Sequence, residues 1–117
     1  MITVGQMTDW IMEHRCGDAF KDWTREQVES AVAYSVNDHT LLYSHDGDKL
    51  SGVMVMAFLG EKELFIAGAL VKKEGLLLNF SEAINTKFRG YKVSATRKGR
   101  HVTYNLNRLT QLLRKMK

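Results

Sequence analysis

Apolar positions in the first third of the chain recur at the spacing of amphipathic helices. Residues 7–14 place Met, Trp, Ile and His three and four positions apart, and Thr8 has a hydroxyl that can cap this first helix. Residues 24–27 read Thr-Arg-Glu-Gln, the pattern of a capping box, and apolar positions follow them on one face. The sequence therefore predicts one helix near the N-terminus and a second over about residues 25–35.

The periodicity changes to that of strands after residue 38. The segment HTLLYSH is rich in β-forming residues, and Asp46-Gly47 is a pair typical of a tight hairpin turn. The partner segment KLSGVMVMAFLG is apolar on both faces, which indicates a central strand that is covered on both sides. A second turn at residues 60–62 leads into a third apolar strand over 63–71. These strands, joined by tight turns, predict an antiparallel meander.

The last third of the chain alternates between helix and strand patterns. Apolar residues from Leu76 to Phe88 recur at helical steps and predict a helix that ends at Gly90. YKVSATR predicts a fourth strand and KGR a turn. A terminal amphipathic helix is then expected, with apolar positions at Val102, Leu106, Leu109, Leu113 and Met116. The expected order is α-α-β-β-β-α-β-α, an α+β (mixed α/β) fold with a mostly antiparallel central sheet in one domain over residues 1–117.

Composition and length are those of an ordinary globular chain, with 117 residues of which 44% are hydrophobic and 26% charged. Cys16 is the only cysteine, which excludes an internal disulfide and favours a reducing compartment. The N-terminus lacks the basic and apolar regions of a signal peptide, and the apolar runs are too short to cross a bilayer. We therefore expect a cytoplasmic protein without a membrane partner.

Charge is distributed unevenly along the chain. Residues 72–117 carry twelve Lys and Arg against Glu74 and Glu82, a net charge of +10, whereas residues 1–71 carry a net charge of −6. Such asymmetry is typical of a chain whose basic part meets an anionic ligand, and it also occurs as an ordinary solvated face. Both interpretations stay open at the level of composition.

The segment that joins the third strand to the following helix brings cations and a glycine together. It reads Lys72-Lys73-Glu74-Gly75, and the helix begins directly after it. Unpaired N–H groups and the positive end of the dipole make a helix start attractive to phosphate, and the two lysines add positive charge. The alternative is a plain strand-to-helix turn in which Gly75 supplies backbone freedom.

The element order and this turn together resemble the GNAT acyltransferase superfamily over about residues 5–115. In that family the turn after the long central strand reads R/Q-x-x-G-x-G/A and grips the pyrophosphate of acetyl-CoA. Lys72 stands at the R/Q position and Gly75 at the first glycine, whereas Leu77 departs from the small residue expected at the second position. The chain looks like a small, degenerate and phage-type member of the superfamily.

The resemblance implies an acyl-CoA-dependent N-acyltransferase in which an unknown amine attacks the thioester of acetyl-CoA directly. It implies cofactor contacts from Leu70, Val71, Lys72, Lys73, Gly75, Leu76 and Leu77. A tyrosine on the last helix often protonates the leaving thiolate in this family. In register Asn107 falls at that position and Tyr104 lies one turn earlier, so both are candidate catalytic residues. The middle of the strand over 63–71 has no titratable residue to act as a base.

Acidic residues of the N-terminal part would surround the acceptor in such a layout and favour a cationic amine: Glu26, Glu29 and Asp38. No metal site is expected, because the four histidines have no ligand-like spacing and one cysteine cannot complete a zinc site.

Two other classes of function stay open. One is a catalytically inactive GNAT-like protein that binds a partner or is packed in a virion. The other is a nucleic-acid-binding protein that follows a phosphate backbone with TRKGRH and the basic positions of the last helix. A homodimer formed through an apolar strand edge is compatible with each class.

Overall fold

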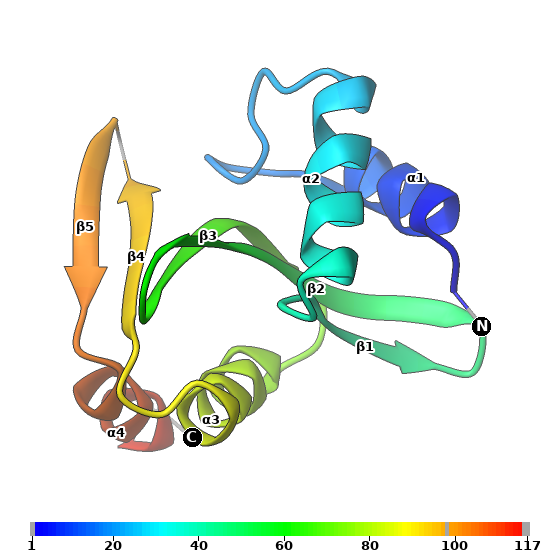
Figure 1. The fold of residues 1–117 in the computed structure, drawn as a ribbon. Coiled ribbons are helices and arrows are strands. Elements are labelled where there is room, and N and C mark those ends of the chain that lie inside the picture. Colours follow the sequence, from blue (N-terminus) through cyan, green and yellow to red (C-terminus); the bar gives the residue numbers. More distant parts are fainter. Residues whose placement is uncertain (1, 98, 116–117) are drawn as a thin grey trace.

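The chain folds into helices and strands that a computed structural model describes for residues 2–97 and 99–115 (Figure 1). The helices are α1 (Val4–His14), α2 (Arg25–Asn37), α3 (Leu76–Lys87) and α4 (Leu106–Lys115). The strands are β1 (Leu42–Asp46), β2 (Lys49–Gly60), β3 (Glu63–Val71), β4 (Lys92–Arg97) and β5 (Arg100–Tyr104). The expected α+β architecture is confirmed, with one strand more than predicted.

Two capping boxes start the N-terminal helices. The Thr3 hydroxyl accepts a hydrogen bond from the N–H of Gln6, and the Gln6 side chain accepts one from the N–H of Thr3. The box at Thr24, predicted from the sequence, is confirmed. The prediction that Thr8 caps the first helix is wrong. Its hydroxyl is buried inside α1 and donates to the Val4 carbonyl at 2.8 Å.

The strands form one sheet in the order β1-β2-β3-β4-β5. Neighbouring strands are antiparallel except β3 and β4, which run parallel. The meander of β1, β2 and β3 is confirmed. A parallel pair needs a long crossover connection, and α3 supplies it between β3 and β4.

The segment after β4 differs from the prediction. We expected a helix from about Val102, but Arg100–Tyr104 forms β5 and pairs with β4 in an antiparallel hairpin that includes Gly99 at a φ of 78°. The run His-Val-Thr-Tyr is rich in β-branched and aromatic residues, and this preference outweighs the helical spacing of its apolar positions. The helix begins only after Asn105, whose side chain accepts a hydrogen bond from the N–H of Arg108.

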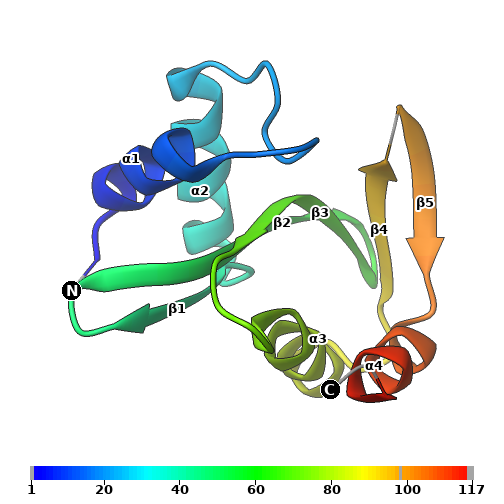
Figure 2. The ribbon, with the colours of Figure 1, turned by 180° about the vertical axis from the view of Figure 1, so that it is seen from behind.

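The sheet lies between two layers of helices, with α1 and α2 on one face and α3 and α4 on the other (Figures 1 and 2). Alternate residues of β2 serve the two cores. Val53 and Val55 pack with the α1–α2 side, whereas Met54 and Met56 pack with α3. This confirms that β2 is a central strand covered on both faces. The radius of gyration is 13.6 Å, close to the value of roughly 13 Å expected for a compact chain of this size.

Within the described ranges, no helix is both long enough and apolar enough to cross a membrane.

Phe20 attaches the connection between α1 and α2 to the sheet. Its side chain is 1% exposed and lies directly on Gly68 of β3, where a Cβ atom would come within 2.5 Å of the ring. The guanidinium of Arg15 holds the same connection by donating to the carbonyls of Phe20 and Trp23, the latter at 2.7 Å. The loop is therefore fastened over the middle of β3.

A side chain at position 68 should disturb this attachment. We expect Gly68→Ala to lower the free energy of unfolding by about 1–3 kcal/mol, because the added methyl group must displace a buried ring. Gly60→Ala is the matched control, since nothing lies within 4 Å of its Cβ position. Urea denaturation of both variants measures the difference, and equal stabilities would contradict the packing described here.

Candidate functional site

The strands β3 and β4 are paired over only part of their length. The parallel ladder joins Glu63–Ile66 of β3 to Lys92–Ala95 of β4. Beyond Ile66, β3 continues to Val71 alongside β2 alone. Figure 2 shows the two strands running apart from the end of the shared ladder. The sheet therefore opens into a wedge between β3 and β4.

A β-bulge lies where this pairing ends. Val55 of β2 pairs with Gly68 and Met56 pairs with Ile66, so Ala67 is an extra residue on β3. A bulge bends its strand and leaves the backbone groups of the extra residue out of the regular ladder. Ala67 is paired with neither β2 nor β4 in the register of the sheet. The bulge thus ends the shared ladder and leaves a stretch of backbone beside the wedge.

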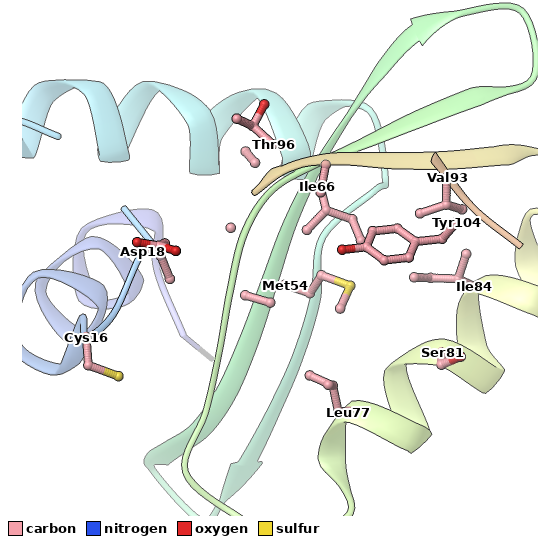
Figure 3. Close-up of a pocket in the computed structure, with 15 residues that line it drawn as sticks. Cys16, Asp18, Met54, Ile66, Leu77, Ser81, Ile84, Val93, Thr96 and Tyr104 are labelled. Carbon is pink, nitrogen blue, oxygen red and sulfur yellow. The ribbon is translucent and has the colours of Figure 1, made fainter. Parts of the chain in front are cut away.

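A cavity of about 410 Å³ occupies the wedge. Its walls come from the α1–α2 connection, from the diverging strands and from α3, as Figure 3 shows. Most of the wall is apolar, and its larger apolar side chains are Met54, Ile66, Leu77, Ile84 and Val93. The polar groups that reach it are Cys16, Asp18, Ser81, Thr96 and Tyr104. An apolar cavity with a few convergent polar groups is typical of a ligand site.

Tyr104 enters the cavity from the end of β5. Its ring lies near Ile66, Val93 and Ile84, and its hydroxyl points across the hollow toward the side where Asp18 lies (Figure 3). The side chain is half-buried, and in residues 2–97 and 99–115 its hydroxyl has no hydrogen-bond partner. The expectation that Tyr104 lies on the last helix is wrong, but its place in the cavity leaves the hydroxyl available to a ligand.

Asn107, the other candidate catalytic residue, lies in the first turn of α4. Its side chain is outside the part of the chain that the structure describes.

The turn between β3 and α3 has both occupied and unoccupied amides. The Lys72 N–H donates to the carbonyl of Ser51 at 2.8 Å, and the Leu76 N–H reaches the Lys73 carbonyl at 3.4 Å. Gly75 has a φ of 84°, in the left-handed region that glycine adopts without strain. Among the described residues, the amides of residues 73–75 and 77–78 have no acceptor. The turn can therefore present several N–H groups to an anion.

The two lysines of the turn have different neighbours. The Nζ atom of Lys72 lies 4.0 Å from the Sγ atom of Cys16, and Cys16 lines the cavity. Lys73 makes an exposed ion pair with Asp46, with 3.5 Å between Nζ and Oδ1. Lys72 is thus the cation of the turn that lies beside the cavity, while a carboxylate offsets part of the charge of Lys73.

The remaining predicted cofactor contacts divide between core and cavity. Leu70 and Leu76 are buried at 4% and 5% exposure. Leu70 belongs to the core on the α1–α2 side, and Leu76 lies beside Gly52 of β2. Val71 is half-buried against the α3-side core. Leu77 is 40% exposed and lines the cavity, so the leucine that departs from the family pattern forms part of its wall (Figure 3).

Sequence reasoning missed the contribution of the α1–α2 connection. Cys16 and Asp18 line the cavity, whereas the acidic residues expected there do not: Glu26, Glu29 and Asp38. The loop carries no motif, and its position depends on the contact between Phe20 and Gly68, which local sequence does not reveal. Within the described residues, no three His, Cys, Asp or Glu side chains are grouped as metal ligands.

Comparison with known proteins gives no assignment: no family model, no curated protein and no solved structure matches the chain.

The two leucines that begin α3 should respond differently to truncation. Leu76→Ala is expected to lower the free energy of unfolding by about 2–5 kcal/mol, because this side chain is buried. Leu77→Ala, at the cavity wall, should cost less than about 1 kcal/mol. Thermal and urea denaturation measure both values, and an equal loss in the two variants would argue against the orientation of α3.

Proposed function

We propose that this chain is an N-acyltransferase that uses acetyl-CoA, with a GNAT-like arrangement of its sheet. The observation that carries the proposal is the wedge between β3 and β4, which opens beside a helix start with several unpaired amides. A cavity alone would suit many ligands. An apolar cavity that adjoins an anion-binding turn suits a ligand with a phosphate at one end and an uncharged arm at the other.

The residues on both sides of the cavity fit the chemical parts of acetyl-CoA. The amides of residues 73–75, the start of α3 and the Lys72 ammonium can hold a diphosphate. The apolar wall formed by Met54, Ile66 and Ile84 can cover an uncharged arm. When bound, the cofactor supplies an activated thioester.

The chain's own groups can assist direct transfer to an amine. The Ala67 amide, outside the regular ladder, can polarise a carbonyl oxygen, because a fixed N–H dipole stabilises developing negative charge. The Tyr104 hydroxyl can donate its proton to the sulfur as the carbon–sulfur bond breaks and the carbon–nitrogen bond forms. The attacking nitrogen loses its extra proton to water, since the middle of β3 holds only Ala67, Gly68 and Ala69.

The same absence of a base on β3 supports a second candidate. A GNAT-like protein without catalysis would bind acetyl-CoA or a protein partner and transfer nothing. Measured turnover separates the two candidates. Cofactor binding without acyl transfer to any amine supports the inactive form, and salt-sensitive binding of DNA or RNA in place of acetyl-CoA supports the nucleic-acid alternative.

Acetyl-CoA should raise the melting temperature. A ligand at about one hundred times its Kd stabilises the folded state by about 2.7 kcal/mol. Lys72→Glu should weaken binding by up to about fivefold, as expected for an exposed charge. Lys92→Glu is the control. Lys92 lies opposite Glu63 in the β3–β4 ladder, at the other end of β3 from Lys72. Calorimetric titration gives both affinities, and the absence of any binding by the wild-type protein would refute the proposal.

Tyr104→Phe tests the proton donor. The variant keeps the ring in the cavity and loses only the hydroxyl, so the affinity for acetyl-CoA should be unchanged. The kcat for transfer should fall by about a hundredfold or more, the usual contribution of a general acid. Thiol release followed with a chromogenic disulfide measures kcat. An unchanged kcat would assign Tyr104 to the wall of the cavity alone.

A further inference from the structure

The layer formed by α1 and α2 covers only one end of the sheet. The core on that side takes its strand residues from β2 and β3, and in the described part of the chain none comes from β4 or β5. Figures 1 and 2 show α1 and α2 over β1 and β2, away from β4 and β5. The face of β4 and β5 that points away from α3 is therefore open to solvent.

The register of the strands identifies the side chains on this open face. Phe65, Ser94 and Thr103 lie opposite one another across β3, β4 and β5, so they share one face of the sheet. Val93 belongs to the core on the α3 side, which places its neighbour Ser94 and the rest of this row on the other face. His101 precedes Thr103 by two positions, shares its face, and is exposed like Thr103.

The rings of Phe65 and His101 form a stacked ring pair on the open face. Their planes differ by 3°, and their centroids lie 6.3 Å apart. Phe65 is half-buried and His101 is exposed, so solvent reaches the ring pair. Unpaired nucleic-acid bases stack on the rings of Phe and His with little regard to base identity, because every base has a π-face.

The segment that builds this end of the fold carries only positive charge. Residues 83–117 contain ten Lys and Arg and no Asp or Glu, and they include β4, β5 and α4. Lys92 and Arg100 are exposed at opposite ends of the β4–β5 hairpin, and among the described residues neither makes an ion pair. Glu63, opposite Lys92 in the ladder, offsets one of these charges. The excess of cations attracts a polyanion to this end of the sheet.

The other edge strand, β1, has a similar ring pair in an acidic setting. Tyr43 and His45 stack with 5.9 Å between their centroids, but Asp46 and Asp48 follow them in the same hairpin. Aromatic rings at a sheet edge therefore do not by themselves indicate a ligand. The β5 edge differs from the β1 edge by the cations around its rings, and this difference favours a ligand with both aromatic groups and negative charge.

We propose that the open face of β4 and β5 binds single-stranded nucleic acid. One base stacks on the ring pair of Phe65 and His101, and the phosphates lie near Lys92 and Arg100. A single strand fits better than a duplex, because the bases of a duplex already stack on one another. None of these four residues lines the cavity beside α3. The inference is therefore independent of the proposed acyltransferase function.

The test measures binding of labelled oligouridylate and oligothymidylate to the full-length protein. Each has about ten nucleotides, a length within the range of single-strand sites. Fluorescence anisotropy gives the affinities, which should fall as the salt concentration rises. Binding of either oligonucleotide supports the proposal, and the ratio of the two affinities shows whether the site prefers RNA or DNA. A saturating concentration of acetyl-CoA should leave both affinities unchanged.

Two pairs of variants test the stacking and the charge. His101→Ala should weaken binding by about fivefold or more, the usual contribution of one stacked base, whereas His45→Ala on β1 should have no effect. Arg100→Ala should reduce the slope of log K against log salt by about 0.7, the value for one phosphate contact with a single strand. Lys49→Ala is its control, because Lys49 begins β2 after the first hairpin turn as Arg100 begins β5. All four residues are exposed, so the variants should fold, and thermal denaturation checks this.

Three results would overturn the proposal. The first is the absence of binding to both oligonucleotides at low salt. The second is equal affinity for duplex DNA or polyglutamate together with wild-type affinity in His101→Ala, which would show attraction of any polyanion by charge alone. The third is displacement of the oligonucleotide by acetyl-CoA together with loss of binding in Lys72→Glu, which would place the ligand at the turn before α3. Failure of acetyl-CoA to bind refutes the acyltransferase and leaves this site standing.

Discussion

The contact between the Phe20 ring and the backbone of Gly68 fixes the α1–α2 connection against β3. Gly68 follows the bulged Ala67, and the bulge ends the pairing between β3 and β4. The same contact holds the α1–α2 connection over β3, because the Phe20 ring occupies the space that a Cβ atom at position 68 would fill. Ala67 and Gly68 of β3 therefore have two effects. They end the pairing with β4, and they provide the surface on which the α1–α2 connection packs.

Patterns of hydrophobicity predicted the elements whose causes are local. The capping box at Thr24 and the two apolar faces of β2 arise from neighbouring residues, and both were confirmed. The final hairpin was missed because residues 100–104 satisfy two periods. Val102 fits a helical stripe with Leu106, yet β-branched and aromatic neighbours and the cap at Asn105 start the helix later. A choice between such periods depends on pairing with β4, which is a tertiary contact.

The candidate site likewise has parts that local sequence predicts and parts that depend on tertiary contacts. The basic turn could be found in the sequence because its residues are contiguous. The amides of residues 73–75 have no acceptor among the described residues, whereas the Lys72 amide donates to Ser51. Tyr104 was proposed from an incorrect helical register, and β5 delivers it to the cavity by another route. Asp18 could not have been found from its neighbours. The Phe20 ring carries it there, and the partner of that ring, Gly68, is distant in sequence.

The acidic and basic parts of the chain both contribute residues near the cavity. The boundary between its acidic and basic parts lies at the end of β3, where Lys72 follows Val71. The fold brings the acidic N-terminal part back to this point, and Cys16 and Asp18 line the same cavity as the start of α3. Lys72 lies beside Cys16 of the α1–α2 connection, so residues of the acidic and basic parts of the chain meet at one edge of the cavity.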